Sequence, residues 1–325
     1  MKILANEFVI PIREGLQCHA SYILPLDDGE LYCVFFYGSR EGNNDVRIYG
    51  SIRSPEGVWN EAVPLSEDDG VPHWNPVLFR RDDGAVLLFY KVGVTIAHWI
   101  TRCRISYDNC RSWEDSFDLV PGDTSGGRGP VRNKPILLKD GSILAPGSTE
   151  QGEWKCFFDR STDGGRTWQR SADVCLPWDQ LGRPDSLNGR GIIQPTLWQS
   201  RDGVHALMRS SEGCIFRSDS PDGITWSVPY STGMPNNNSG IDCVALPDGR
   251  LVLVCNPVGH NWGKRTPLSV YLSQDDGRTF QLLTHLNTNA QGAYAYPAVQ
   301  YSDGKLHISY TWDRLTIAYM CLSDL

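Results

Sequence analysis

The chain has 325 residues, with 30 Lys and Arg against 38 Asp and Glu, and therefore a formal net charge of −8. This acidity argues against a general nucleic-acid-binding protein, which carries a basic surface. Hydrophobic residues make up 40% and charged residues 21%, as is usual for a globular chain, and no apolar run is long enough to span a membrane.

The N-terminal segment carries one Lys and then a short apolar stretch that Asn6 and Glu7 interrupt. It lacks the apolar core of a secretory signal, so we expect a cytoplasmic protein. The ten cysteines show no zinc-binding spacing, and several lie in apolar runs, so most are expected to be reduced core thiols. Because no nucleotide-binding glycine motif occurs either, we expect neither a metal nor a cofactor.

One pattern recurs along the whole chain: an Asp-Gly turn followed by a run typical of a β-strand. It appears as DDGELYCVFF, DDGAVLLFY, KDGSILAPG, RDGVHALMRS, PDGRLVLVC and SDGKLHISYT, with the turn glycines at Gly29, Gly84, Gly141, Gly203, Gly249 and Gly304. Asp-Gly between two apolar runs is a strong hairpin signal, because glycine tolerates a positive φ. The spacing of about 55 residues divides the chain into six units.

A second repeat falls between the first. STDGGRTW (161–168) and SQDDGRTF (273–280) match fully, while SYDNCRSW (106–113), SPDGITW (220–226) and SPEGVW (54–59) are degenerate. Its Asp can accept hydrogen bonds from turn amides, its glycine takes a strained backbone, and its aromatic residue can pack between neighbouring sheets. We therefore expect these motifs to be structural.

These motifs are similar to Asp-box (BNR) repeats, and over residues 10–320 the chain resembles the sialidase superfamily of six-bladed β-propellers. The resemblance implies an all-β fold, with residues 1–325 as a single domain of six four-stranded blades. The run EFVIPI (7–12) is expected to supply the outer strand of the last blade. Residues 121–130 and 179–191 are expected to be loops within the domain.

Strand order predicts which residues meet at one face. The Asp-Gly turns and Asp boxes fall at one end of the disc, so first-strand starts and second-strand ends lie at the other. This end, the mouth, should collect His19, Glu41, Asp45, His73, Trp74, Asn75, Lys91, Asn133, Lys134, Glu150, Gln194, Arg209, Asn256, Arg265, Tyr296 and Arg314. Five of these are cations, which predicts an anionic ligand, and guanidinium groups suit a carboxylate.

Sialidases hold the substrate carboxylate with an arginine triad and use a tyrosine nucleophile assisted by a glutamate, with an aspartate as acid and base. The resemblance implies that Arg209 and Arg265 are the second and third arginines and that Tyr296 is the nucleophile. Asp45 lies near the acid/base position, and Glu41 competes for that role.

Two positions depart from the family pattern. His19 stands where the first arginine is expected, and it could hydrogen-bond the substrate or act as a base. Gln194 stands where the glutamate is expected. Glutamine cannot take up a proton, so Gln194 could orient the tyrosine but could not act as its base.

Three functions remain open. The first is a sialidase-like exo-glycoside hydrolase acting on a terminal acidic sugar, either sialic acid or a related ulosonic or uronic acid. The second is a lyase of uronate glycans, in which His19 or His73, Tyr296, Asn75 and an arginine perform a β-elimination. The third is a carbohydrate-binding propeller without activity. All three take an acidic glycan as partner, and none involves nucleic acid or a membrane.

Overall fold

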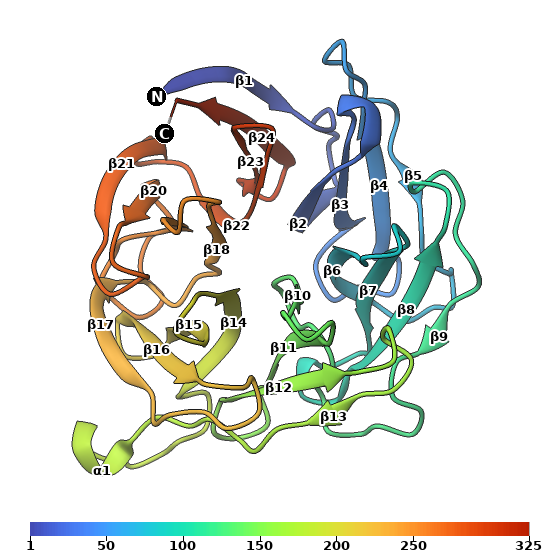
Figure 1. The fold of residues 1–325 in the computed structure, drawn as a ribbon. Coiled ribbons are helices and arrows are strands. Elements are labelled where there is room, and N and C mark those ends of the chain that lie inside the picture. Colours follow the sequence, from blue (N-terminus) through green and yellow to red (C-terminus); the bar gives the residue numbers. More distant parts are fainter. Residues whose placement is uncertain (325) are drawn as a thin grey trace.

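The computed structural model describes residues 1–324 as a ring of six antiparallel four-stranded sheets, the blades (Figure 1). Blade one comprises β2 (Gln17–Pro25), β3 (Leu31–Gly38), β4 (Arg47–Arg53) and β5 (Val63–Pro64). Blade two comprises β6 (His73–Arg80), β7 (Val86–Val92), β8 (Ile100–Ser106) and β9 (Phe117–Asp118). Blade three comprises β10 (Ile136–Leu137), β11 (Ile143–Thr149), β12 (Lys155–Ser161) and β13 (Gln169–Arg170). The six-bladed all-β expectation is confirmed.

The second half of the ring follows the same plan. Blade four comprises β14 (Ile192–Gln199), β15 (Val204–Ser210), β16 (Cys214–Ser220) and β17 (Tyr230–Pro235). Blade five comprises β18 (Asp242–Ala245), β19 (Leu251–Cys255), β20 (Leu268–Ser273) and β21 (Gln281–Asn287). The short helix α1 (Trp178–Leu181) lies between blades three and four, and no described helix is long and apolar enough to cross a membrane.

Blade six joins the two ends of the chain. Its strands β22 (Tyr294–Ser302), β23 (Lys305–Trp312) and β24 (Thr316–Ser323) are completed by β1 (Lys2–Phe8), which pairs antiparallel with β24. The N-terminal outer strand is therefore confirmed, but it lies earlier than residues 7–12. Val9 and Ile10 are instead buried between blades, and Pro11 has no N–H to continue the pairing.

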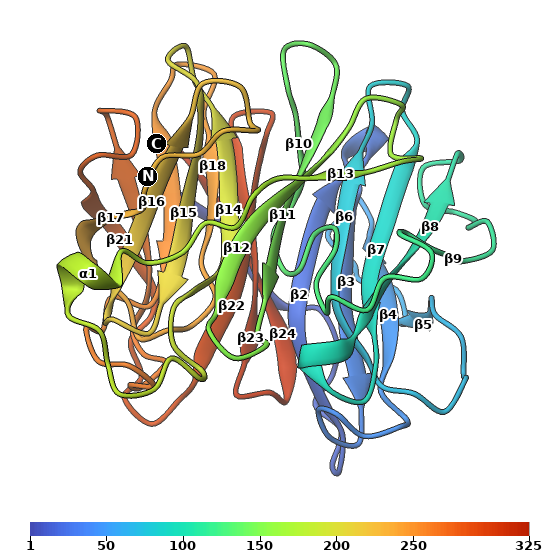
Figure 2. The same cartoon turned by 90° about the horizontal axis from the view of Figure 1, so that it is seen from below.

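Both repeats occupy the positions that the sequence predicts. Each Asp-Gly turn joins the first two strands of a blade, with φ +79° at Gly29 and +87° at Gly84. The Asp boxes join the third and fourth strands at the same end, and Asp163 accepts hydrogen bonds from the Arg166 and Thr167 amides at 3.0 and 2.9 Å. These turns leave the mouth at the opposite end of the disc (Figure 2).

The Asp-box aromatics pack on the preceding blade. Trp168 meets Phe89 edge-on with ring centroids 6.2 Å apart, and Trp226 stacks on Phe158 at 3.7 Å. Side chains between adjacent blades form the hydrophobic core. All ten cysteines are free thiols and eight are buried, as expected for core residues.

A buried ion pair ties four blades together near the centre. The Lys134 ammonium donates to both Asp242 oxygens at 2.9 and 2.8 Å and to the carbonyl oxygens of Cys243 and Val299 at 2.8 and 3.1 Å. Asp242 also accepts from the Thr196 hydroxyl and the Val299 amide, both at 2.8 Å. The pair is therefore fully hydrogen-bonded, the condition under which a buried charge is tolerated.

Replacing Asp242 by Ala should destabilise the fold by about 3–5 kcal/mol, because Lys134 would remain as an unpaired buried charge. Urea denaturation followed by circular dichroism measures this free energy of unfolding. Asp248→Ala is the matched control, because Asp248 lies in an exposed turn where it bonds Arg250 at 2.7 Å. Equal stability of the two variants would contradict this role of the pair.

Candidate functional site at the propeller mouth

Bulges in the first strands shape the mouth. In four blades the pairing of the first strand with the second shifts register beside a residue of positive φ. These residues are Ala20 (+53°), Asn75 (+42°), Gln194 (+52°) and Tyr296 (+55°). Such conformations are strained for residues other than glycine and bend the strand locally, which re-aims its side chains. The same irregularity thus recurs around the ring at one depth.

Tyr296 lies among arginines from three blades. Its hydroxyl accepts a hydrogen bond from Arg209 Nη1 at 3.0 Å. The guanidinium carbons of Arg132, Arg265 and Arg209 lie 5.3, 5.5 and 5.8 Å from its ring centroid. Burial raises the pKa of the phenol, but the charges of Arg209 and Arg265 outweigh it, so the pKa is lower than usual. The phenol at this position therefore loses its proton more readily than an ordinary tyrosine.

Gln194 and Asn238 orient Arg209 by hydrogen bonds. Arg209 Nη1 donates to Gln194 Oε1 and Arg209 Nε to Asn238 Oδ1, both at 2.9 Å. The backbone N–H of Gln194 donates to Ser148 Oγ at 3.1 Å. Gln194 thus reaches Tyr296 through the shared Arg209, an orienting contact of the kind that a glutamine can make.

His19 packs against the same tyrosine. Its ring centroid lies 4.2 Å from that of Tyr296, and its Nδ1 pairs with Thr311 Oγ1 at 2.8 Å. Burial lowers its pKa well below the usual value, and the charges of Arg314 and Arg265 lower it further. The imidazole is therefore neutral, and its buried Nε2 has no partner among the described residues.

Arg132 completes the cluster, although sequence reasoning missed it. It is 1% exposed, and its Nη2 donates to the carbonyl oxygens of Tyr296 and Pro297 at 2.6 and 2.9 Å. Its Nε and Nη1 are buried without partners in the described part of the chain. The run VRNKPI (131–136) could have indicated it. Its first cation, Arg132, faces Tyr296, whereas Asn133 and Lys134 do not.

Arg265 is the cation most open to a ligand. Over residues 1–324 no hydrogen bond or ion pair engages its guanidinium, which lies over the Tyr296 ring. Burial lowers its pKa, an effect that the tyrosine partly offsets. An arginine that is largely desolvated and unpaired gains most from a bidentate carboxylate.

The two expected acid candidates lie in different surroundings. Glu41 pairs with Arg314, and its charge acts on the pKa of Tyr296. Asp45 accepts from the Ser39 amide and hydroxyl, both at 2.8 Å. Burial raises the Asp45 pKa, but the Ser39 hydrogen bonds and the charge of Arg47 together outweigh it, so the pKa is lowered. Asp45 is therefore held ionised, whereas Glu41 is the blade-one carboxylate that acts on Tyr296.

A third carboxyl, Glu150, follows the end of β11. Alternation along an extended chain puts it on the same side as Ser148, which bonds the Gln194 amide. Burial raises the pKa of Glu150, and the charge of Arg209 opposes the rise. Strand order predicts Glu150 at the mouth but no role for it, because the burial of one side chain cannot be predicted from its residue type.

The structure corrects two of the five expected cations. The Lys134 ammonium already donates its hydrogen bonds to Asp242 and to backbone carbonyl oxygens. Lys91 is fully buried and donates to Thr101 Oγ1 at 2.6 Å and to the Arg128 carbonyl at 2.8 Å. Burial lowers the Lys91 pKa to about 7. Both lysines turn toward acceptors between blades, so neither offers a cation to a ligand at Tyr296.

Several other expected residues make internal bonds. Asn133 donates to the Gln194 and Pro195 carbonyls, both at 3.1 Å, and Asn256 to those of Pro267 and Tyr294, both at 2.9 Å. These side-chain amides therefore support the strand ends around the mouth. They were expected to bind substrate, but their NH₂ groups are used within the protein.

The blade-two residues form a separate group. His73 pairs with Ser66 at 2.6 Å and Asp69 at 3.2 Å, and burial lowers its pKa to about 4. Trp74 donates to the Gly93 carbonyl at 2.9 Å, while Asn75 sits on the bulge and is buried. Trp74 also packs against Phe36, which in turn contacts His19. The group thus borders the site without contacting Tyr296.

Comparison with known families agrees with this architecture. The family of BNR repeat-like domains matches residues 29–308. The chain belongs to the BNR repeat-like family. Solved sialidases share its fold at low sequence identity. No curated protein matches the chain.

Solved structures share the fold at low sequence identity. A Dyadobacter fermentans protein of unknown function is 15% identical with a TM-score of 0.80, covering 100% of this chain and 99% of its own. The Hadza microbial sialidase Hz136 is 13% identical with a TM-score of 0.76 over 94% of this chain and 66% of its own. A Trypanosoma rangeli sialidase bound to the inhibitor DANA is 14% identical with a TM-score of 0.71, over 94% and 55%. The chain thus spans less than two thirds of the length of these two sialidase chains.

Proposed function

We propose that the protein is an exo-glycoside hydrolase that removes a terminal acidic sugar, such as sialic acid or a related ulosonic or uronic acid. The observation that carries this proposal is the phenol of Tyr296, whose pKa is lowered, among Arg132, Arg209 and the unpaired Arg265. Guanidinium groups bind a carboxylate with short, charge-assisted hydrogen bonds. The sugar carboxylate would lie against Arg209 and Arg265, with its anomeric carbon near the phenol oxygen.

The carboxyls supply the proton transfers in this proposal. Glu41, which pairs with Arg314, accepts the phenol proton while the Tyr296 oxygen bonds to the anomeric carbon. The glycosidic C–O bond breaks, and its oxygen takes a proton from Glu150. Water then attacks the anomeric carbon, giving its proton to Glu150, and the released phenolate recovers its proton from Glu41. Gln194 holds Arg209 in place throughout.

The raised pKa of Glu150 predicts a basic limb in the pH profile. A buried carboxyl stays protonated to a higher pH, so the acid is available below its pKa and is lost as the pH rises through it. Glu150→Gln should lower kcat about 10²- to 10⁴-fold and remove this limb. Asp45→Asn is the matched control. An unchanged pH profile in Glu150→Gln would assign the acid to another carboxyl.

Incubation with a panel of sialylated and uronate-containing oligosaccharides tests the function. Released acidic monosaccharide is expected, and it should depend on Tyr296. Binding of acidic sugars without product would instead indicate a lectin-like propeller. If no sugar of the panel is bound and none is released, the proposal is overturned.

One observation favours β-elimination as the second candidate. The neutral imidazole of His19 lies 4.2 Å from Tyr296 between centroids, so a base and a phenol stand side by side near cations that could neutralise a uronate carboxylate. A lyase produces an unsaturated sugar with new ultraviolet absorbance, and a hydrolase does not. Absorbance recorded with the same panel therefore separates the two reactions.

A further inference from the structure

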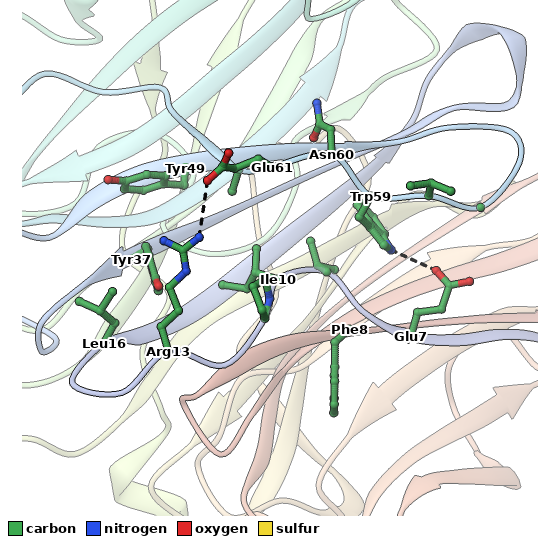
Figure 3. Close-up of a pocket in the computed structure, with 15 residues that line it drawn as sticks. Glu7, Phe8, Ile10, Arg13, Leu16, Tyr37, Tyr49, Trp59, Asn60 and Glu61 are labelled. Atoms are coloured by element: carbon green, nitrogen blue, oxygen red, sulfur yellow. Dashed lines mark hydrogen bonds and ion pairs between the residues drawn. The ribbon is translucent and has the colours of Figure 1, made fainter.

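A cavity lies at the outer edge of the ring, away from Tyr296. It has a volume of about 890 Å³ and lies where β1 and the segment after it meet blade one (Figure 3). Its lining runs from Glu7 to Leu16, includes Tyr37 and Tyr49, and ends with residues 57–62 between β4 and β5. None of the residues assigned above to the mouth lines it. Its size falls in the upper part of the range typical of ligand pockets, about 300–1,000 Å³.

Aromatic rings fixed by contacts behind them form the walls. The Trp59 indole donates to Glu7 at 3.1 Å, and its ring meets Tyr319 edge-on at 5.6 Å. Phe8 meets Trp312 edge-on at 5.3 Å, yet remains 48% exposed. These contacts hold each ring in one orientation, and the remaining ring surface is available to a ligand without further ordering.

The charges in the pocket are already paired. Both Glu7 oxygens accept from Arg53, at 2.9 and 2.6 Å, and this pairing lowers the Glu7 pKa. Arg13 forms a second ion pair with Glu61, at 3.5 Å (Figure 3). The lining charges thus occur in balanced pairs, one held by two hydrogen bonds and one exposed to solvent, in contrast to the mouth with its unpaired Arg265.

Uncommitted neutral polar groups complete the lining. Within residues 1–324 the hydroxyls of Tyr37 and Tyr49 make no hydrogen bond, and the two rings meet edge-on at 5.4 Å. Asn60 adds only its exposed side-chain NH₂ group, because its Oδ1 already accepts from the Ser51 hydroxyl at 3.0 Å and the Ile52 amide at 2.7 Å. A ligand for this pocket needs an apolar face for the rings and a periphery of neutral hydroxyls for these groups.

We propose that this pocket binds a neutral oligosaccharide. A sugar ring has an apolar face of C–H groups, which would lie on Trp59 or Phe8, and a rim of hydroxyls, which would meet the tyrosine hydroxyls and Asn60. The pocket runs along the outer edge of blade one, from Leu16 and Tyr37 near the mouth end to the turn at residues 57–59 near the other end. The inference does not depend on the proposed hydrolase activity.

Calorimetric titration of the full chain with cellotetraose, xylotetraose, maltotetraose and N-acetyllactosamine tests the proposal, with ligand-observed NMR in parallel. At least one of these sugars should bind at millimolar or lower concentration. Phe8→Ala and Trp59→Ala should each weaken that binding at least roughly tenfold. Phe8 serves as the second variant because it is half exposed, whereas Trp59 also supports Tyr319.

Two mouth variants are the matched controls, both in the segment between β19 and β20 that also carries Asn256. Arg265→Ala removes the open cation, and Trp262→Ala removes an aromatic ring that is 60% exposed outside this pocket. Neither should change the affinity for the neutral sugar. Absence of binding to all four sugars would overturn the proposal, as would binding that is lost in the mouth variants and retained in Phe8→Ala. Binding of apolar or anionic probes alone at this pocket would also overturn it.

Discussion

Replacing Tyr296 by Phe should lower kcat for acidic-sugar release by at least about 10³-fold, because it removes the attacking oxygen and no other described side chain offers one at this position. Binding should persist, since Arg209 keeps its bonds to Gln194 and Asn238 and the variant loses a single hydrogen bond of about 1 kcal/mol. Steady-state kinetics and calorimetry with the same substrate measure the two effects separately.

Tyr294→Phe is the matched control for this variant. Tyr294 lies two residues away on β22, and its buried hydroxyl has no partner in the described structure. Its removal should leave kcat unchanged. Turnover that survives in Tyr296→Phe, or that falls equally in both variants, would contradict the role of Tyr296.

Replacing Arg265 by Ala should weaken binding of the acidic sugar by about 1.5–3 kcal/mol, or roughly 10- to 100-fold in Kd. The fold should tolerate the change, because no described group depends on this guanidinium for a hydrogen bond. Calorimetry with the acidic sugar, and with the same sugar after reduction of its carboxylate to an alcohol, measures the affinity. The reduced sugar should bind wild type and variant with similar affinity.

Arg166→Ala provides the control for removal of a positive charge. Arg166 lies in an exposed Asp-box turn at the opposite end of the disc, so its loss should affect the affinity little. If both arginine variants weaken binding equally, the mouth does not recognise the carboxylate locally. If Arg265→Ala weakens both forms of the sugar equally, the contact is not to the carboxylate.

Local signals in the sequence were enough to predict the fold. An Asp-Gly pair needs a tight turn with positive φ, and the six turns that recur at regular intervals define six hairpins. The Asp-box aromatics had to pack somewhere, and they do so on the preceding blade. The exact start of the outer strand β1 was less certain, because strand ends depend on which backbone groups find partners.

The site was harder to predict because it depends on where long side chains turn. Strand order places Lys134 and Arg132 near the same strand end, but only packing decides that Lys134 turns to Asp242 while Arg132 lies over the Tyr296 ring. Lys91 finds its acceptors between blades for the same reason. By contrast, the structure does bring Arg209, Arg265, His19 and Gln194 together around Tyr296. First-strand bulges position His19, Gln194 and Tyr296, while Arg209 comes from the end of β15 and Arg265 from the segment before β20.

The most direct test of this account is mass spectrometry of the protein after acid quenching during turnover of an acidic glycoside. If Tyr296 attacks the anomeric carbon, the peptide that contains it should carry the added mass of the sugar. The adduct should be absent from Tyr296→Phe and present in Tyr294→Phe. Sustained product release with no adduct on this peptide, and with full activity in Tyr296→Phe, would contradict the central claim that this tyrosine acts on an acidic sugar.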